Sequence, residues 1–189
     1  MTRIIAGEHR GRLIKVPDAG TRPTAQRVRE AVFSTLISLD AVAEITVLDL
    51  YAGSGALGIE AISRGAEQCL FVENNHDAVL VINKNIADLK LNAHVVDAKV
   101  EILLAAKPAE KLNMPAQLIF LDPPYEMSLV EIVKVINLGL SNSWFSDDAI
   151  LVIETAKRSG DFVWPAGFES IREKNYGDTC VWYGQVCKK

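Results

Sequence analysis

The sequence contains few cysteine and histidine residues and no long apolar run. Its three cysteines form neither a CxxC pair nor an even set for disulfides, and its three histidines lie far apart in the chain. No uninterrupted apolar stretch approaches the roughly 20 residues that a membrane helix needs, and the N-terminus lacks the apolar core of a secretory signal. These absences argue against a membrane protein, a disulfide-stabilised secreted domain and a site built on clustered metal ligands. We therefore expect a cytoplasmic protein that needs no metal.

The length of the chain suits one well-buried domain. It has 189 residues, of which 49% are apolar, which is enough for a sizeable core but too few for two full domains. No internal repeat, linker or low-complexity tract divides it. We expect a catalytic domain over residues 41–189, preceded by a small basic extension over residues 1–40, in a monomer.

The pattern of apolar residues predicts an α/β fold with a parallel sheet. Apolar runs predict strands at 45–50, 68–73, 93–96, 117–121 and 149–154. Helical spacing lies between them, near 56–64, 76–89, 99–106 and 128–139. Such alternation indicates parallel strands joined by helices. The last two segments, 168–175 and 179–186, are separated by three residues only, so they predict a terminal antiparallel hairpin.

The N-terminal segment up to Glu30 is basic although the chain as a whole is acidic. This segment holds seven basic side chains against three acidic ones, a net charge of +4, so the rest of the chain carries −8 and the total is −4. Residues 3–6 and 13–16 flank a charged, glycine-containing turn, which predicts a small β-hairpin extension that projects the basic residues. A helix should follow it. Such a surface either binds phosphates or is a solvated hairpin with incidental arginines. The candidate RNA-binding residues are Arg3, Arg10, Arg12, Arg22, Arg27 and Arg29.

A glycine-rich loop follows the first predicted strand of the sheet. Gly53-x-Gly55-x-x-Gly58 matches the fingerprint of a nucleotide-binding loop, in which glycine lets the backbone approach a ligand. Glu73 ends the next strand, about 20 residues after Gly53, where an acceptor for ribose hydroxyls belongs. The sequence therefore predicts a nucleoside ligand, and the candidate residues of the loop itself are Tyr51, Ala52, Gly53, Ser54 and Gly55.

The acidic residue ahead of these glycines indicates which nucleoside is bound. Asp49 lies four residues before Gly53 and places a carboxylate near the ligand. A carboxylate suits a cation better than a pyrophosphate. S-adenosylmethionine carries a sulfonium and an ammonium and no phosphate, whereas NAD needs the positive start of the helix free of nearby acids. We therefore expect S-adenosylmethionine as the cofactor.

The tetrapeptide Asp122-Pro123-Pro124-Tyr125 directly follows an apolar strand. An exocyclic amine of a nucleobase is a poor nucleophile, because its lone pair is delocalised into the ring. A carboxylate and a fixed backbone carbonyl can accept its two N–H groups and aim the nitrogen at a methyl donor. The prolines stiffen this pair of acceptors, and the tyrosine offers an aromatic face for the base. The alternative is that the tetrapeptide merely ends a strand.

In these motifs the chain resembles the RsmD family of methyltransferases, which modify guanine N2 in a hairpin loop of small-subunit ribosomal RNA. The resemblance covers nearly the whole chain. It is carried by residues 3–7, 10–12, 22–24, 29–33, 48–58 and 63–66 together with the tetrapeptide. The tetrapeptide alone also occurs in adenine-N6 methyltransferases of DNA, so it does not fix the substrate. Tyr51 stands where such loops often have phenylalanine, a mild departure.

The resemblance implies a fold, a reaction and a partner. The fold is the class I S-adenosylmethionine-dependent methyltransferase fold, a Rossmann-like sheet of seven strands in the order 3-2-1-4-5-7-6. Asp97 would accept from the adenine amine of the cofactor and the Ala98 backbone would meet its ring, although Asp97 could instead cap the helix after it. The substrate would be 16S ribosomal RNA, within the assembling or assembled 30S subunit, and the methyl group would pass directly to N2.

Three other functions compete with this one. A DNA adenine-N6 methyltransferase shares the amine chemistry but usually needs a sizeable target-recognition segment. An NAD-dependent oxidoreductase would use the glycine loop but leave the tetrapeptide at 122–125 without a role. An inactive RNA-binding module would leave three acids, Asp49, Glu73 and Asp122, unexplained.

Overall fold

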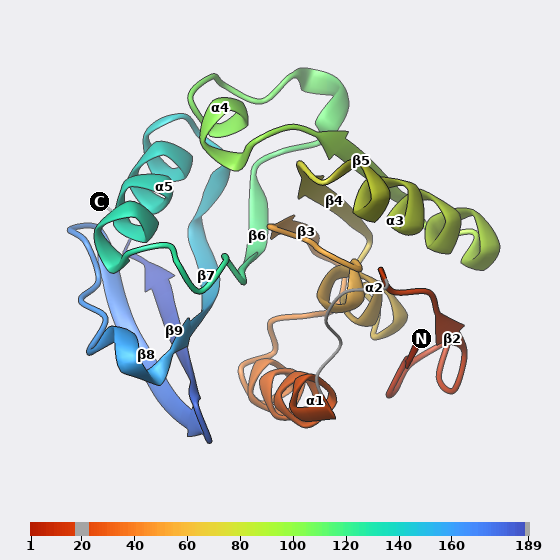
Figure 1. The fold of residues 1–189 in the computed structure, drawn as a ribbon. Coiled ribbons are helices and arrows are strands. Elements are labelled where there is room, and N and C mark those ends of the chain that lie inside the picture. The colour runs from red at the N-terminus through yellow and green to blue at the C-terminus, as the bar shows by residue number, and fades with distance from the viewer. Residues whose placement is uncertain (18–22, 188–189) are drawn as a thin grey trace.

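The computed structural model of the protein describes residues 1–17 and 23–187. Its centre is a seven-stranded sheet in the order β5-β4-β3-β6-β7-β9-β8, which is the predicted order 3-2-1-4-5-7-6 (Figure 1). Five strands run parallel: β3 (Thr46–Leu50), β4 (Gln68–Glu73), β5 (Ala93–Asp97), β6 (Ala116–Leu121) and β7 (Phe145–Ala156). The hairpin of β8 (Phe168–Tyr176) and β9 (Thr179–Val186) closes the sheet antiparallel to β7. The predicted class I methyltransferase fold is confirmed.

Helices cover both faces of this sheet. The first face packs against α1 (Pro23–Ser38), α2 (Ala56–Ser63) and α3 (His76–Leu89). The second face packs against α4 (Val100–Leu104) and α5 (Leu129–Ser141). Short 3-10 turns are η1 (Glu110–Leu112) and η2 (Lys157–Ser159). Over the described ranges, none of the helices is both long and apolar enough to cross a membrane.

Strand residues alternate between these two faces. In β6, Leu118 and Phe120 belong to the core on the first face, while Ile119 and Leu121 belong to the core on the second. This period of two is inherent in an extended chain. Since helices cover both faces, every residue of such a strand can be apolar, which is why the central strands appear in the sequence as continuous apolar runs.

β7 and α4 differ in extent from their predictions. β7 begins at Phe145 rather than 149, because it opens with the polar residues 146–148, which carry no apolar signal. It pairs there across an irregularity in its register with β6. α4 is shorter than the predicted helix at 99–106 and covers only residues 100–104.

Residues 1–17, which we call the N-terminal arm, lie against α2 and α3 (Figure 1). The predicted hairpin is present, although its strands β1 (Thr2–Arg3) and β2 (Leu13–Ile14) have only two residues each. The hairpin packs on the domain through Ile4 and Ile14, which are each 2% exposed and share the core of the first face. Its arginines Arg3, Arg10 and Arg12 stay exposed, as predicted. The division at residue 40 stays a prediction.

Candidate functional site

The carboxyl ends of neighbouring strands bring the predicted site residues to one edge of the sheet. Leu50 at the end of β3 pairs with both Val72 of β4 and Leu121 of β6. Glu73, the last residue of β4, pairs with Asp97 of β5. In an open parallel sheet, ligands bind outside this edge. The loops that follow β3, β4, β5 and β6 therefore form one candidate site.

The glycine loop after β3 adopts a backbone that side chains disfavour. Tyr51, Gly53 and Gly55 have φ angles of 60°, 56° and 74°, in the left-handed region that glycine enters at little cost. Gly58 is needed for a different reason: a Cβ there would lie 2.4 Å from Cε1 of Phe71 in β4. This glycine lets the start of α2 pack closely on the sheet.

Asp49 is buried beneath the loop, 1% exposed. Its Oδ2 accepts a hydrogen bond from the Gly58 N–H at 2.9 Å. The pKa of Asp49 is raised to about 8: burial raises it most, the hydrogen bond from Gly58 lowers it, and the nearby carboxylates of Asp122 and Glu73 also raise it. Because the ionised form is disfavoured here, Asp49 would gain from a cationic ligand.

Glu73 holds the glycine loop to the end of β4. Its Oε2 accepts from the Gly53 N–H at 2.7 Å, and its Oε1 accepts from the N–H groups of Asn74 and Asn75 at 2.9 and 2.8 Å. A carboxylate has about four acceptor positions, so this side chain can take a further donor. The ribose role stays a prediction, and the loop that would carry the cofactor is fixed by the same residue.

Asp97 and Ala98 follow β5. The helix after them begins at Val100 with Lys99 as its N-cap, so the alternative that Asp97 caps this helix is wrong. The Asp97 side chain is 51% exposed and lies 3.5 Å from His76 Nδ1. The Ala98 N–H donates to the Glu73 carbonyl at 3.1 Å. Ala98 therefore uses its N–H within the protein, and its contact with the ring of the cofactor stays a prediction.

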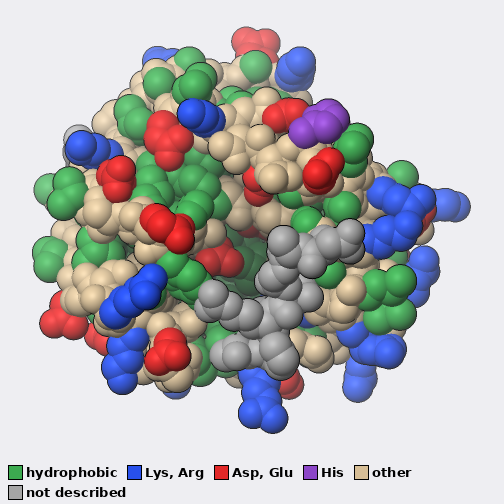
Figure 2. Space-filling model, viewed as in Figure 1, with side chains coloured by type: hydrophobic (Ala, Val, Ile, Leu, Met, Phe, Trp, Pro, Cys, Tyr) green, Lys and Arg blue, Asp and Glu red, His purple; other side chains and the backbone are tan. Residues whose placement is uncertain are grey.

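Two cavities adjoin at this edge, and Tyr51 lines both of them. The first has a volume of about 280 Å³, and its lining includes Asp49, Gly53, Ser54, Phe120, Asp122 and Glu154. The second has about 400 Å³, and its lining includes Glu73, Ala98, Glu101, Pro124 and Met127. Figure 2 shows Asp and Glu side chains in and around the central hollow of this face, whereas Lys and Arg gather at the right of the view, over α3 and the N-terminal arm.

Tyr51 joins the two cavities and is held in place. Its hydroxyl donates to Oε1 of Glu101 in α4 at 2.6 Å. Burial and the neighbouring carboxylate raise the pKa of Tyr51 well above its ordinary value, so it remains a donor. The sequence motifs did not single out Glu101, because no signal in the chain links this residue to the distant glycine loop.

Three of the four residues after β6 line three different cavities. Asp122 lines the first cavity and Pro124 lines the second. Tyr125 lines a third cavity, of about 250 Å³, together with Lys157, Arg158 and Asp178. Asp122 and the glycine loop therefore line the same cavity. The stacking role of Tyr125 stays a prediction, and Tyr125 would contact the base from the third cavity.

The six candidate RNA-binding arginines do not share one environment. Arg3, Arg10, Arg12 and Arg27 are exposed, whereas Arg22 lies outside the described residues. Arg29 is only 5% exposed, so the expectation that it lies on the surface is wrong. Desolvation lowers the pKa of its guanidinium, partly offset by Glu60. Its position suits a structural role better than a phosphate contact.

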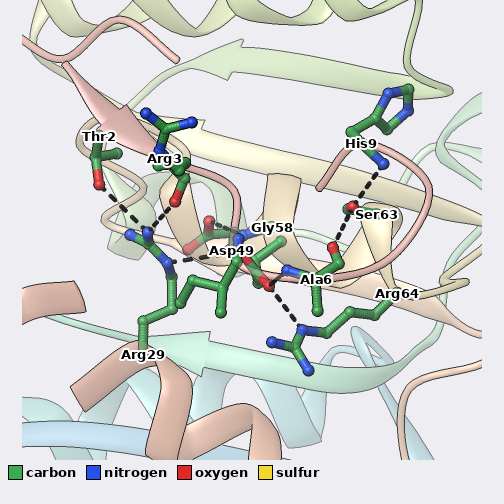
Figure 3. A network of polar contacts seen from close by, with 11 residues as sticks. Thr2, Arg3, Ala6, His9, Arg29, Asp49, Gly58, Ser63 and Arg64 are labelled. Atoms are coloured by element: carbon green, nitrogen blue, oxygen red, sulfur yellow. Dashed lines mark hydrogen bonds and ion pairs between the residues drawn. The ribbon is translucent and has the colours of Figure 1, made fainter. Parts of the chain in front are cut away.

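Arg29 belongs to a buried polar network that fastens the N-terminal arm (Figure 3). Its Nη2 donates to the Arg3 carbonyl at 2.8 Å and its Nε lies 3.8 Å from Oε2 of Glu60. Glu60, 1% exposed, also accepts from Arg64 Nε at 2.7 Å. The same carboxylate accepts the backbone N–H groups of Ile5 and Ala6 at 2.8 and 3.1 Å. One glutamate of α2 thus anchors two arginines and the arm.

Sequence reasoning also missed residues at the far side of the first and third cavities. Glu154 is a single acid after the buried apolar run 149–153 of β7, and it lines the first cavity. Lys157 and Arg158 follow on η2. A lone charge interrupting a central strand was the available signal for Glu154. Among the described residues, no three His, Cys, Asp or Glu side chains gather as a group that could hold a metal.

Known proteins share both the sequence and the fold. Residues 2–185 match the family model described as Conserved hypothetical protein 95. The chain is 39% identical to Ribosomal RNA small subunit methyltransferase D of Escherichia coli strain K12 over 177 residues, which cover 93% of this chain and 85% of the relative. The solved structure of yhhF from Escherichia coli has a TM-score of 0.86 at 34% identity, covering 99% of this chain and 98% of that one.

A distant structure shares the fold alone. Magnesium protoporphyrin IX methyltransferase from Synechocystis PCC 6803, solved with bound S-adenosylmethionine, has a TM-score of 0.66 at 13% identity over 90% of this chain and 86% of that one. The match of the family model and the identity to methyltransferase D cover nearly the whole chain. The resemblance drawn from the motifs is therefore confirmed, and the chain belongs to the RsmD family of methyltransferases.

Proposed function

We propose that this protein methylates the exocyclic N2 of a loop guanine in 16S ribosomal RNA, using S-adenosylmethionine. One observation carries the proposal: Asp122, which opens the tetrapeptide at the end of β6, lines the same cavity as Asp49 and the glycine loop. An amine acceptor and a methyl-donor site thereby adjoin. The relative named Ribosomal RNA small subunit methyltransferase D supports the class of substrate.

The residues around the glycine loop fit S-adenosylmethionine. The cofactor supplies a methyl group on a positively charged sulfur. The buried Asp49 carboxylate, whose pKa is raised to about 8, favours a positively charged ligand. Glu73 retains acceptor capacity for ribose hydroxyls beside the loop, and Asp97 and Ala98 lie at the next strand end for the adenine. An NAD-dependent oxidoreductase is disfavoured, since a pyrophosphate would face this carboxylate.

The tetrapeptide would orient the target amine. The Asp122 carboxylate and the Pro123 carbonyl would each accept one N2–H, leaving the nitrogen lone pair directed at the methyl group. These acceptors also stabilise the positive charge that grows on the nitrogen, so they favour the transition state over the ground state. Pro123 is buried, which fixes the carbonyl. Tyr125 would hold the base or its neighbour from the rim.

The two cavities at the edge of the sheet are lined by several acidic residues, so phosphate contacts must come from residues outside them. The exposed arginines Arg3, Arg10, Arg12 and Arg27 provide them on the side of the arm. Exposed Lys157 and Arg158 supply cations beside Tyr125 on the other side. An RNA loop that spans the cavities would then contact cations on both sides of them. A loop guanine is already partly unstacked, which reduces the energy of extruding it.

The substrate form, the monomeric state and a cytoplasmic location are part of this proposal. A small arm suits recognition of 16S RNA that is already folded, in the assembling or assembled 30S subunit. A DNA adenine-N6 methyltransferase is the rival with similar amine chemistry, and an inactive RNA-binding module is the rival without catalysis. Neither rival accounts for both the small arm and the acidic cofactor site.

One experiment separates these functions. Labelled-methyl transfer from S-adenosylmethionine is measured on unmodified 30S subunits, naked 16S RNA and adenine-unmethylated DNA, and the products are identified by nucleoside mass spectrometry. We expect N2-methylguanosine in an RNA sample. Methyladenine in DNA, or no transfer to any substrate, would overturn the proposal.

The Asp122→Ala variant tests the assigned role in the same assay. Turnover should fall by about 100-fold or more, because an acceptor at the reacting nitrogen is lost. The dissociation constant of S-adenosylmethionine should change far less, since Asp122 is assigned to the base. Glu169→Gln is a suitable control, because Glu169 is an exposed acid on β8. An equal loss of cofactor binding in Asp122→Ala would refute the assignment.

A further inference from the structure

We propose that Glu154 selects guanine by accepting a hydrogen bond from its N1–H. The inference rests on the proposed function, because it assigns a recognition role to a second carboxylate of the cavity that Asp122 lines. It concerns a choice that the tetrapeptide leaves open. The exocyclic amines of guanine and adenine both suit a carboxylate and a carbonyl acceptor, so another group must distinguish the two bases.

The register of two strands relates the position of Glu154 to that of Asp122. β6 and β7 pair in parallel with Leu121 opposite Ile153. Asp122 directly follows β6, and Glu154 is the next residue of β7, so the register brings both residues to the same end of this strand pair.

The face of the sheet to which Glu154 points is also defined. Val152, two residues earlier in β7, belongs to the core on the side of α1 and α2. By the period of two, Glu154 points to this same side. This is the side of the first cavity, which Asp122 and Glu154 both line. Its lining also includes Asp49, so the base and the cofactor sites share this space.

Glu154 is an acid that directly follows the buried apolar run of a central strand. β7 lies between β6 and β9, and Glu154 pairs with Val181 of β9. It is half-buried, and it follows the wholly buried apolar run 149–153. Phe120, Val152 and Val181 provide the apolar walls of the first cavity, which suit the faces of a flat base.

The hydrogen-bonding edges of the bases decide what two carboxylates accept. Guanine presents N1–H beside its N2 amine, which gives adjacent donors. Adenine presents an unprotonated N1 beside its N6 amine, so a carboxylate there would face an acceptor. An ionised carboxylate can only accept. When Asp122 accepts from the amine and Glu154 faces N1 of the ring, guanine provides a donor to each carboxylate. Adenine would instead place its N1 acceptor against the Glu154 carboxylate. Enzymes that act on extruded bases read them by this edge.

A base analogue isolates the predicted contact. 2-Aminopurine keeps the exocyclic N2 amine but has an unprotonated N1. It is placed at the target position by ligation, in the form of substrate that accepts methyl groups in the assay above. Values of kcat/KM are then measured for guanine and for 2-aminopurine with the wild-type protein, with Glu154→Gln and with the Glu169→Gln control.

We expect the wild-type protein to prefer guanine by about 100-fold. In Glu154→Gln the preference should fall to about 10-fold or less, because the amide can also donate to an unprotonated N1. The control should keep the wild-type preference. Since 2-aminopurine also lacks O6, the change caused by the substitution, rather than the wild-type ratio, measures the contact with N1.

Each result bears on one of the two proposals. A wild-type protein that methylates guanine, combined with a preference that Glu154→Gln leaves unchanged, overturns the role of Glu154 and leaves the proposed function standing. Absence of transfer to guanine by the wild type overturns the proposed function, and this inference falls with it. The affinity for S-adenosylmethionine and the Tm of Glu154→Gln are measured in parallel. A loss of cofactor affinity equal to the loss of kcat/KM would assign Glu154 to the cofactor and overturn the inference.

Discussion

The Arg29 guanidinium lies 3.8 Å from the Glu60 carboxylate, and both side chains are almost completely buried. This pair connects three segments, because Arg29 also donates to the Arg3 carbonyl and Glu60 accepts from the N–H groups of Ile5 and Ala6 (Figure 3). The basic character of the first segment thus has two parts. Some arginines are available for phosphates, and at least one builds the surface that presents them.

Replacing Arg29 with alanine should destabilise the protein by about 2–4 kcal/mol, because a buried carboxylate loses part of its compensation and the Arg3 carbonyl loses its donor. Arg27→Ala is the matched control on the same helix. Arg27 is exposed, so the free energy of unfolding should change by less than about 0.5 kcal/mol. Urea unfolding of both variants measures the difference. Equal stabilities of the two variants would contradict the structural role of Arg29.

For RNA affinity, we expect the larger loss in Arg27→Ala rather than in Arg29→Ala. Arg27→Ala should weaken the complex at low salt, because a surface cation is lost. Arg29→Ala, measured at a temperature where it remains folded, should affect binding only through the arm. A direct phosphate contact by Arg29 would instead give a loss at least as large as that of Arg27→Ala.

The spacing of apolar residues along α1 indicates that Arg29 is buried, whereas its residue type indicates that it is exposed. It precedes Val32, Phe33 and Leu36 by three, four and seven positions, so it lies on their face of α1. Arginine is rarely fully buried unless it is paired, and its partner Glu60 lies on another helix, beyond the first strand of the sheet. A single sequence gives no indication of that pairing, whereas it predicts the strands directly from their apolar runs.

The candidate site likewise contains residues that the sequence predicted and residues that it did not. The loop at 51–58, Glu73 and the tetrapeptide at 122–125 were predictable because local motifs at strand ends converge on one edge of a parallel sheet. Glu101 was not, since it reaches Tyr51 through tertiary packing. For Glu154 the only signal was a lone acid in a central strand, which does not indicate the cavity that it lines. The assignment of Tyr125 to a separate cavity likewise depends on η2 and the β8–β9 turn, which the motif does not describe.

Asp49 should make the ligand-free protein less stable as the pH rises. Its pKa is raised to about 8 in the folded state and is about 4 when unfolded. Between these values the unfolded chain has lost a proton that the native protein keeps, so stability decreases with pH by up to about 1.4 kcal/mol per unit from this residue. Above pH 8 the contribution levels off.

The variant Asp49→Asn isolates this effect, because the amide oxygen can still accept from the Gly58 N–H and does not titrate. The advantage in Tm of Asp49→Asn over the wild type should increase from pH 5 to pH 8. A difference that stays constant over this range would contradict the raised pKa. Binding of S-adenosylmethionine should show the reverse, with wild-type affinity increasing toward pH 8 and the variant weak throughout.

Gly58 should not tolerate a methyl group. A Cβ at this position would lie 2.4 Å from Cε1 of Phe71 and 2.5 Å from Sγ of Cys69. We expect Gly58→Ala to destabilise the protein by about 1–3 kcal/mol and to weaken cofactor binding, because the start of α2 must move. The double variant with Phe71→Leu should recover part of both losses. Strictly additive effects in this double-mutant cycle would show that the contact is not the cause.

The exposed arginines of the arm should account for much of the salt dependence of RNA binding. Arg10→Ala with Arg12→Ala removes two exposed cations, so the slope of log K against log salt should decrease in magnitude by about 1.5. Lys107→Ala with Lys111→Ala is the matched control, because both lysines are exposed and precede β6, at the edge of the sheet opposite the site. Filter binding at several salt concentrations measures both slopes. If the control lowers the slope as much as the arm variant does, the contribution is one of net charge alone and the arm is not the phosphate-binding surface.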